Sequence, residues 1–271
     1  MPVSAKVETR ISTELKRFQT ILAAAKQRDV SEADTVVILT DFLSAVLGYD
    51  KYQHITREFA IRGTYVDLAV RVDGDIRFLI EAKAIGVELK ENHVKQAIDY
   101  GANNGLDWVI LSNGAVWRAY KIQFTQPIDK TLVFDLDLLG RSHKDAEVIE
   151  CLGSLSKEGF SRGSMADLLE QRQLTSAYTI AAALLSETLV DQLRKELRRM
   201  APSLKVDNEY LAALLSNEVI KRELVDSDAA KSARLLVRKL QRNWEKERKV
   251  SSKPEAIAAT AVQSPESESG E

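Results

Sequence analysis

The feature that most constrains this fold is a pair of apolar segments, residues 64–72 and 76–84, on either side of the turn sequence Asp73-Gly74-Asp75. With a two-residue turn, each face of the hairpin would mix apolar and charged side chains. A longer loop or a bulge makes one face wholly apolar. That register pairs Val72 with Ile76, Val70 with Phe78, Leu68 with Ile80 and Val66 with Ala82. Because a slip of one residue moves every side chain to the other face, we predict this second register.

The predicted register gathers three charged side chains on the opposite face. Asp67 lies opposite Glu81, and Lys83 follows Glu81 at the two-residue spacing that keeps strand side chains on one face. Two carboxylates this close repel each other unless a cation lies between them. Mg²⁺ prefers oxygen ligands and needs only one or two protein carboxylates, and a nearby lysine stabilises charge on a phosphate. The pattern therefore indicates metal-assisted phosphodiester hydrolysis, against the simpler interpretation of a solvated strand face with a surface ion pair.

A helix expected at residues 92–104 carries Gln96 and Tyr100, which lie four residues apart on one side. Both side chains suit the orientation of a phosphate or of a water at a metal. Alone they are also typical of a helix surface with a half-buried tyrosine, so they gain meaning only beside the strand pair.

Together these segments resemble a known family. Asp67, then Glu81-Ala82-Lys83, then Gln96 and Tyr100 follow the PD-(D/E)xK nuclease signature. More narrowly, the chain resembles the N-terminal nuclease domain of the type I restriction enzyme R subunit, which also occurs in stand-alone relatives. The segments that carry this resemblance are residues 65–69, 79–84, 96–101 and 108–114, with Trp117 and Tyr120. It covers roughly residues 31–122, less than half of the chain.

The resemblance implies a role for each of these residues. Asp67, Glu81 and the backbone carbonyl of Ala82 would bind Mg²⁺, with Mn²⁺ as a substitute, and Lys83 would be catalytic. Gln96 and Tyr100 would orient the scissile phosphate.

A further carboxylate stands at the start of an expected helix. The family often adds a glutamate from its first core helix, and Glu32 occupies that place after Ser31, a typical N-cap residue. Glu32 therefore fits either a metal ligand or a first-turn carboxylate that interacts favourably with the helix dipole. Both interpretations stay open from the sequence.

The implied function is Mg²⁺-dependent cleavage of DNA, linked to restriction of foreign DNA and to other subunits of a restriction system. Val66 stands where the family's first motif has proline. The helicase motor of the R subunit is absent, and without a GxxxxGK[ST] loop we expect no ATP site in this chain. The main alternative is a non-catalytic DNA-binding or assembly subunit of a restriction or defence complex, and a third is a nuclease that acts on RNA.

The order of the predicted elements divides the chain into three parts. Residues 1–142 alternate helix and strand patterns and predict an α/β, restriction-endonuclease-like core, a mixed central sheet flanked by helices. Asn113-Gly114 is a strong hairpin signal within it. Residues 143–249 carry almost only helical patterns and predict an all-α region. Residues 250–271 are rich in Ser, Glu and Ala and predict a disordered acidic tail.

Composition narrows the chemistry of any metal site. The single cysteine, Cys151, excludes a disulfide framework, and the three widely spaced histidines argue against a histidine-based metal cage, so carboxylates would have to hold the metal. The net charge of −2 leaves room for a locally basic surface. The first residues contain no apolar signal core and no apolar run is long enough to span a bilayer, so we expect a cytoplasmic protein without membrane contact.

Two basic runs in the helical region are candidates for phosphate binding. Residues 189–200 carry four basic side chains opposite an apolar stripe, and a solvated helix face is the favoured interpretation. Residues 231–249 carry eight basic and two acidic side chains. There Trp244, between Arg242 and Lys246, favours nucleic-acid binding slightly more.

Overall fold

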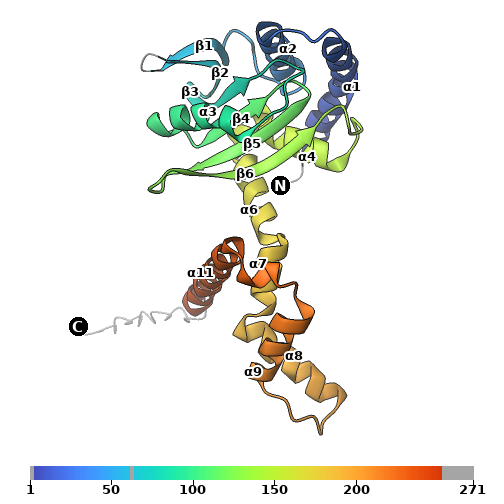
Figure 1. Cartoon of the computed structure of the whole chain (residues 1–271), viewed down its shortest axis with the longest axis vertical. Helices are drawn as coiled ribbons and strands as arrows, with labels where there is room; N and C mark the ends of the chain where they lie inside the picture. The colour runs from blue at the N-terminus through green and yellow to red at the C-terminus, as the bar shows by residue number, and fades with distance from the viewer. Residues whose placement is uncertain (1–2, 62–63, 252–271) are drawn as a thin grey trace, which may run out of the picture. The chain divides into compact units, whose positions relative to one another are not determined.

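The computed structural model describes residues 3–61 and 64–251 (Figure 1). The chain divides into two compact units, Met1–Arg172 and Gln173–Glu271. The tail predicted for residues 250–271 lies outside the described residues from residue 252 onward.

The first unit is built on a mixed six-stranded sheet flanked by helices, which confirms the predicted α/β class. The strands lie side by side in chain order: β1 (Ile55–Ile61), β2 (Thr64–Val72), β3 (Asp75–Ala82), β4 (Trp108–Ser112), β5 (Val116–Gln123) and β6 (Asp129–Asp137). Neighbours are antiparallel except β3 and β4, which are parallel and are connected by α3 (Glu91–Asn103). The Asn113-Gly114 hairpin is present between β4 and β5.

The pairing of β2 with β3 follows the predicted register over its inner part. Two of the expected pairs are present, Leu68–Ile80 and Val70–Phe78. The expected pair of Val72 with Ile76 is wrong, because Val72 pairs with Asp75 across a two-residue turn. The register changes between Val70 and Arg71, so a bulge reconciles the tight turn with a continuous apolar face.

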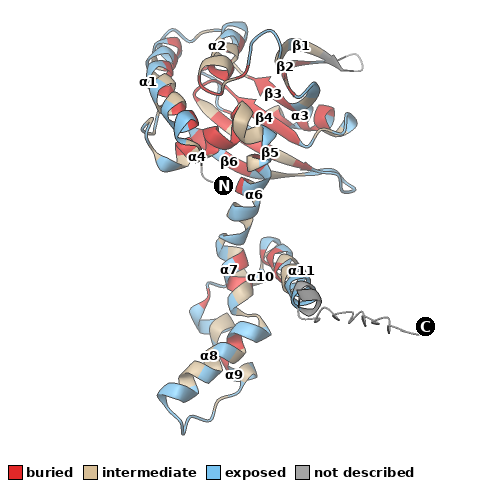
Figure 2. Cartoon of the chain, turned by 180° about the vertical axis from the view of Figure 1, so that it is seen from behind, coloured by how far each residue is buried: buried red, intermediate tan, exposed pale blue. Residues whose placement is uncertain are grey.

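Helices cover both faces of the sheet. One core lies between the sheet and three helices, α1 (Ala5–Gln27), α2 (Glu32–Ala45) and α4 (Ala146–Leu155). A separate core lies between α3 and the opposite face, where Val94 and Ala97 meet Val109 and Leu111. Figure 2 shows the buried residues along the strands and on the helix faces turned towards them.

The first unit extends beyond the domain boundary predicted at residue 142. It includes α4 and α5 (Lys157–Ser161), and Cys151, Leu152 and Leu155 are buried in the same core as the sheet. The sequence shows that α4 has an apolar stripe, but such a stripe does not say which neighbour will cover it.

The second unit is helical, as predicted for this region. Its elements follow α6 (Ser164–Leu174): α7 (Ala177–Leu184), α8 (Glu187–Met200), α9 (Asn208–Leu214), the π-helical turn η1 (Leu215–Val219), α10 (Glu223–Asp226) and α11 (Asp228–Ser251). A small core joins α7 to α11 through Ala182, Ala233 and Val237. Among the described residues, no helix has the length and apolarity needed to cross a membrane.

Candidate functional site

Asp67 is fixed at the point where the ladder between β2 and β3 ends. The last regular pair is Leu68 with Ile80, and beyond it the backbone N–H of Ala82 donates to Oδ2 of Asp67 at 2.7 Å. In a regular antiparallel ladder this N–H would bond to the backbone of β2. The Asp67 carboxylate replaces that acceptor, which holds it next to the carboxyl end of β3.

Glu81 and Lys83 lie beside Asp67 at this end of β3. Glu81 is buried, with 4% of its surface exposed, and Nζ of Lys83 donates to its Oε1 at 2.7 Å. The Lys83 side chain is itself only 19% exposed. The structure therefore brings together the two carboxylates and the ammonium that the register predicts on one face.

The charges of this group are not balanced. Burial raises the pKa of Asp67 above its usual value, although the Ala82 hydrogen bond and Lys83 oppose the shift. Burial likewise raises the pKa of Glu81, and the hydrogen bond from Lys83 does not cancel it. Burial alone would lower the pKa of Lys83, but the bond to Glu81 and the neighbouring carboxylates raise it. One ammonium thus compensates two carboxylates that have both lost part of their hydration.

Glu32, the first residue of α2, also reaches the group. Its Oε2 lies 3.6 Å from Nζ of Lys83, and its side chain is 48% exposed. The Ser31 hydroxyl accepts the N–H of Asp34, which confirms the predicted N-cap and positions Glu32 in the first helical turn. Glu32 therefore lies both at the helix N-terminus and next to the charged group, which fits both interpretations.

A further acidic residue, Glu58, was not singled out as part of the site. β1 pairs Arg57 with Leu68 and Phe59 with Val66, which leaves Glu58 facing Asp67 with a φ of 46°. Besides the burial of Asp67 itself, the Glu58 charge contributes to the raised pKa of that residue. The alternation of β1 does not mark Glu58, because its position opposite Asp67 depends on the register of β1 against β2.

Gln96 and Tyr100 lie together on α3, as their spacing predicts. Nε2 of Gln96 donates to the Tyr100 hydroxyl at 3.0 Å. The Tyr100 ring packs with Ala69 and Leu79, which are the strand neighbours of Asp67 and Glu81 on the same face of the sheet. The buried tyrosine thus covers the sheet beside the charged group, while Gln96 is exposed.

The donor set at this place consists of oxygen atoms. Ala82 is buried at the end of β3, where it pairs with Ser112 of β4. Over the part of the chain that the structure describes, no three His, Cys, Asp or Glu side chains are already arranged to hold a metal ion. Two hard carboxylates without a third protein ligand still fit Mg²⁺, which keeps several waters when it binds.

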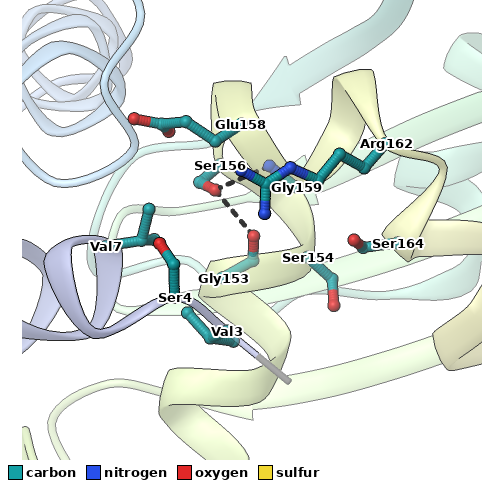
Figure 3. Close-up of a pocket in the computed structure, with 10 residues that line it drawn as sticks. All are labelled: Val3, Ser4, Val7, Gly153, Ser154, Ser156, Glu158, Gly159, Arg162 and Ser164. Carbon is teal, nitrogen blue, oxygen red and sulfur yellow. Dashed lines mark hydrogen bonds between the residues drawn. The ribbon is translucent and has the colours of Figure 1, made fainter. Parts of the chain in front are cut away.

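A pocket elsewhere in the first unit contains none of these residues. It lies between the start of α1 and the helices α4 and α5 (Figure 3). Its central hydroxyl, on Ser156, donates to the Gly153 carbonyl at 2.7 Å and accepts the N–H of Gly159 at 3.2 Å. These bonds satisfy the Ser156 hydroxyl and cap α5, so this hydroxyl has a structural role and need not bind a ligand.

Comparisons with protein-family models, curated proteins and solved structures find no match to this chain.

Proposed function

We propose that this chain is a Mg²⁺-dependent endonuclease that hydrolyses phosphodiester bonds of DNA. The observation that carries the proposal is the pair of partly dehydrated carboxylates, Asp67 and Glu81, next to a single lysine. Buried carboxylates with raised pKa values are costly to a fold, and such groups concentrate at functional sites. The resemblance of the sequence to PD-(D/E)xK nucleases supports the same assignment.

In this proposal each residue has a separate task. Asp67 and Glu81 bind the ion together with the Ala82 carbonyl, and Glu32 adds a more exposed carboxylate to the same place. When bound, Mg²⁺ polarises a phosphoryl oxygen and lowers the pKa of a water molecule. Lys83, released from Glu81, stabilises the negative charge that develops on the phosphate.

The remaining residues position the substrate. Gln96 and Tyr100 are linked by a hydrogen bond, and the ring of Tyr100 is fixed against the sheet. Their polar ends are donors suited to a phosphate oxygen. Orientation by groups that are already fixed reduces the entropy lost in reaching the transition state.

A cleavage assay on supercoiled plasmid tests this proposal. The parent protein should nick or cut the plasmid with Mg²⁺ and not with EDTA. Lys83→Gln should reduce the rate by about 10²- to 10³-fold, the usual cost of one charge-stabilising donor. Asp135→Asn removes a carboxylate that pairs with Arg118 at 2.8 Å in the same sheet, and it should cut like the parent. Equal rates for the parent and Lys83→Gln would refute the site assignment.

The alternative of a non-catalytic binding or assembly subunit has one observation in its favour. The second unit leaves large apolar side chains exposed, among them Met200, Tyr210, Val219 and Leu235. Exposed apolar side chains that form a contiguous patch are typical of a partner surface. A binding subunit would hold DNA in EDTA and give no product with Mg²⁺ or Mn²⁺, so the same assay separates the two functions.

A further inference from the structure

Basic residues recur along one side of α11. Lys231, Arg234, Arg238, Arg242 and Lys246, here called the basic side, are spaced by three or four residues. At 3.6 residues per turn they therefore form a single row, which extends over about 22 Å. All of them are exposed except Arg234, which is half-buried.

Four of the five residues of the basic side have no acidic partner among the described side chains. No acidic residue occurs between Asp228 and Glu245, and α7, against which α11 packs, contains no charged residue. Lys231 pairs with Asp228, whereas Arg234, Arg238, Arg242 and Lys246 take part in none of the ion pairs formed by the side chains that the structure describes, which do not include that of Glu247. Asp226 of the adjacent α10 is paired with Arg222.

α8 shows what a self-compensated basic helix looks like in the same unit. There Arg194 and Lys195 both pair with Asp191, and Arg199 pairs with Glu196. Arg198 donates to the Val206 carbonyl. The positive charges of α8 are therefore compensated within the unit, whereas Arg234, Arg238, Arg242 and Lys246 of α11 take part in none of the ion pairs of the described side chains.

The opposite side of α11 is already used in packing. Ala233 and Val237 are buried against α7. The exposed Leu235 and Trp244 are nine residues apart and so lie on opposite sides of the helix, where they form no apolar face for a lipid surface. Trp244 is not part of the basic side, since it lies beneath the Arg248 guanidinium, 4.8 Å from its ring centre. What α11 presents is a straight row of cations, most of them arginines, which bind phosphate with two hydrogen bonds.

We infer that the basic side of α11 is a second DNA-contact surface, which binds backbone phosphates and is not part of the Asp67–Glu81 site. The choice of DNA among polyanions rests on the proposed function. The contact itself follows from the uncompensated row of charge, because each lysine or arginine that neutralises a phosphate releases a condensed counterion.

The test measures the binding of a short fluorescein-labelled DNA duplex to the full chain by anisotropy, in EDTA and over about 50 to 200 mM salt. Arg238→Gln/Arg242→Gln/Lys246→Gln removes three charges, and glutamine keeps the helix propensity. Affinity should fall at least about tenfold, and the slope of log K against log salt should fall by about 2.7. Circular dichroism should show an unchanged helix content.

A matched control removes three charges from α8. Lys195→Gln/Arg198→Gln/Arg199→Gln should change the affinity less than about twofold, since these side chains are compensated within the unit. Equal losses in the two triple variants, or parental affinity in the α11 variant, would overturn the inference. Tighter binding of an RNA duplex through the same residues would overturn the choice of DNA. Binding of the parent to phosphatidylserine vesicles but not to DNA would overturn it in favour of a lipid surface.

The inference about α11 and the nuclease proposal can be refuted separately. The duplex is bound in EDTA, where Mg²⁺-dependent cleavage does not occur, so the measured affinity does not depend on nuclease activity. A protein that binds through α11 but never cleaves would contradict only the nuclease proposal. A protein that cleaves with Lys83 dependence but binds normally without the basic side would contradict only the inference about α11.

Discussion

Two groups of charges in the first unit join carboxylates to a cation, with opposite results. The Arg10 guanidinium donates to both oxygens of Glu158, at 2.6 and 2.8 Å, and also to the carbonyls of Val46 and Leu47. These bonds connect α1 to the end of α2 and to α5. Because of the Arg10 hydrogen bonds, the pKa of Glu158 is lowered.

At the Asp67–Glu81 site the pKa values of the carboxylates shift in the opposite direction. There the pKa values of both carboxylates are raised, chiefly by burial, although Lys83 bonds to Glu81. The first group is compensated and stabilises the fold, whereas the second is incompletely compensated and is compatible with a cation from outside the chain. The comparison shows that the balance of charge, rather than the mere presence of an ion pair, separates a structural group from a functional candidate.

The largest effect on stability should come from the compensated group. Arg10→Ala removes four hydrogen bonds and leaves Glu158 without its partner, so the free energy of unfolding should fall by about 2–3 kcal/mol. Urea denaturation measures this loss. Arg17→Ala, which removes only an exposed pair with Glu14 on the same helix, should cost less than about 1 kcal/mol. Similar losses in both variants would show that the Arg10 hydrogen bonds stabilise the fold no more than an exposed ion pair does.

Removing a charge from the Asp67–Glu81 site should not lower the free energy of unfolding. Glu81→Gln keeps the shape of the side chain and an acceptor for Lys83 but removes a partly dehydrated charge. Its free energy of unfolding should equal that of the parent or exceed it by up to about 1 kcal/mol, while cleavage should fall more than about 100-fold. A large loss of stability in urea would mean that Glu81 holds the fold together, as Arg10 does.

The pH dependence of stability sharpens the contrast. Since the pKa of Glu158 is lower in the folded state than in the unfolded state, its contribution is complete above the ordinary glutamate pKa and is lost as the pH falls through the folded value. The stability difference between the parent and Glu158→Gln should therefore shrink from pH 6 to pH 3, in urea titrations at each pH. A difference that grows as the pH falls would contradict the assignment.

The smallest expected effect concerns Cys151, where burial is the main cause of a raised pKa. Its thiol has a pKa raised to about 12 by burial, and Arg172 donates to its sulfur at 3.2 Å. Iodoacetamide at pH 8 should leave the folded protein unmodified and alkylate it in urea, as mass spectrometry would show. Rapid alkylation of the folded protein would mean that this part of the core opens.

The sequence predicts the central part of the sheet because burial and register are coupled there. Only one pairing of the apolar residues of β2 and β3 gives a continuous face, and it brings Asp67 and Glu81 together without reference to any other segment. The turn is different. Val72 pairs with Asp75 because a bulge costs little at the exposed end of a hairpin, and the apolar pattern does not specify where the bulge forms.

The residues that the sequence does not place are those whose position depends on distant elements. Glu58 faces Asp67 because of the register of β1 against β2, which the residue pattern of β1 does not specify. Leu152 and Leu155 form part of an apolar stripe on α4, but only the folded chain shows that this stripe packs in the same core as the sheet. Likewise, the sequence shows two basic runs, and only the ion pairs of the folded chain show that the charges of α8 are compensated within the unit.

The most direct measurement is the binding of a divalent ion, because it requires no knowledge of the substrate. Electron paramagnetic resonance of free Mn²⁺ counts the ions taken up by the parent, Asp67→Asn, Glu81→Gln and the control Asp135→Asn. The parent and the control should each bind an Mn²⁺ ion that Mg²⁺ displaces, and the two site variants should lose it. Equal uptake by all four proteins, or none by the parent, would contradict the assignment of Asp67 and Glu81 as metal ligands.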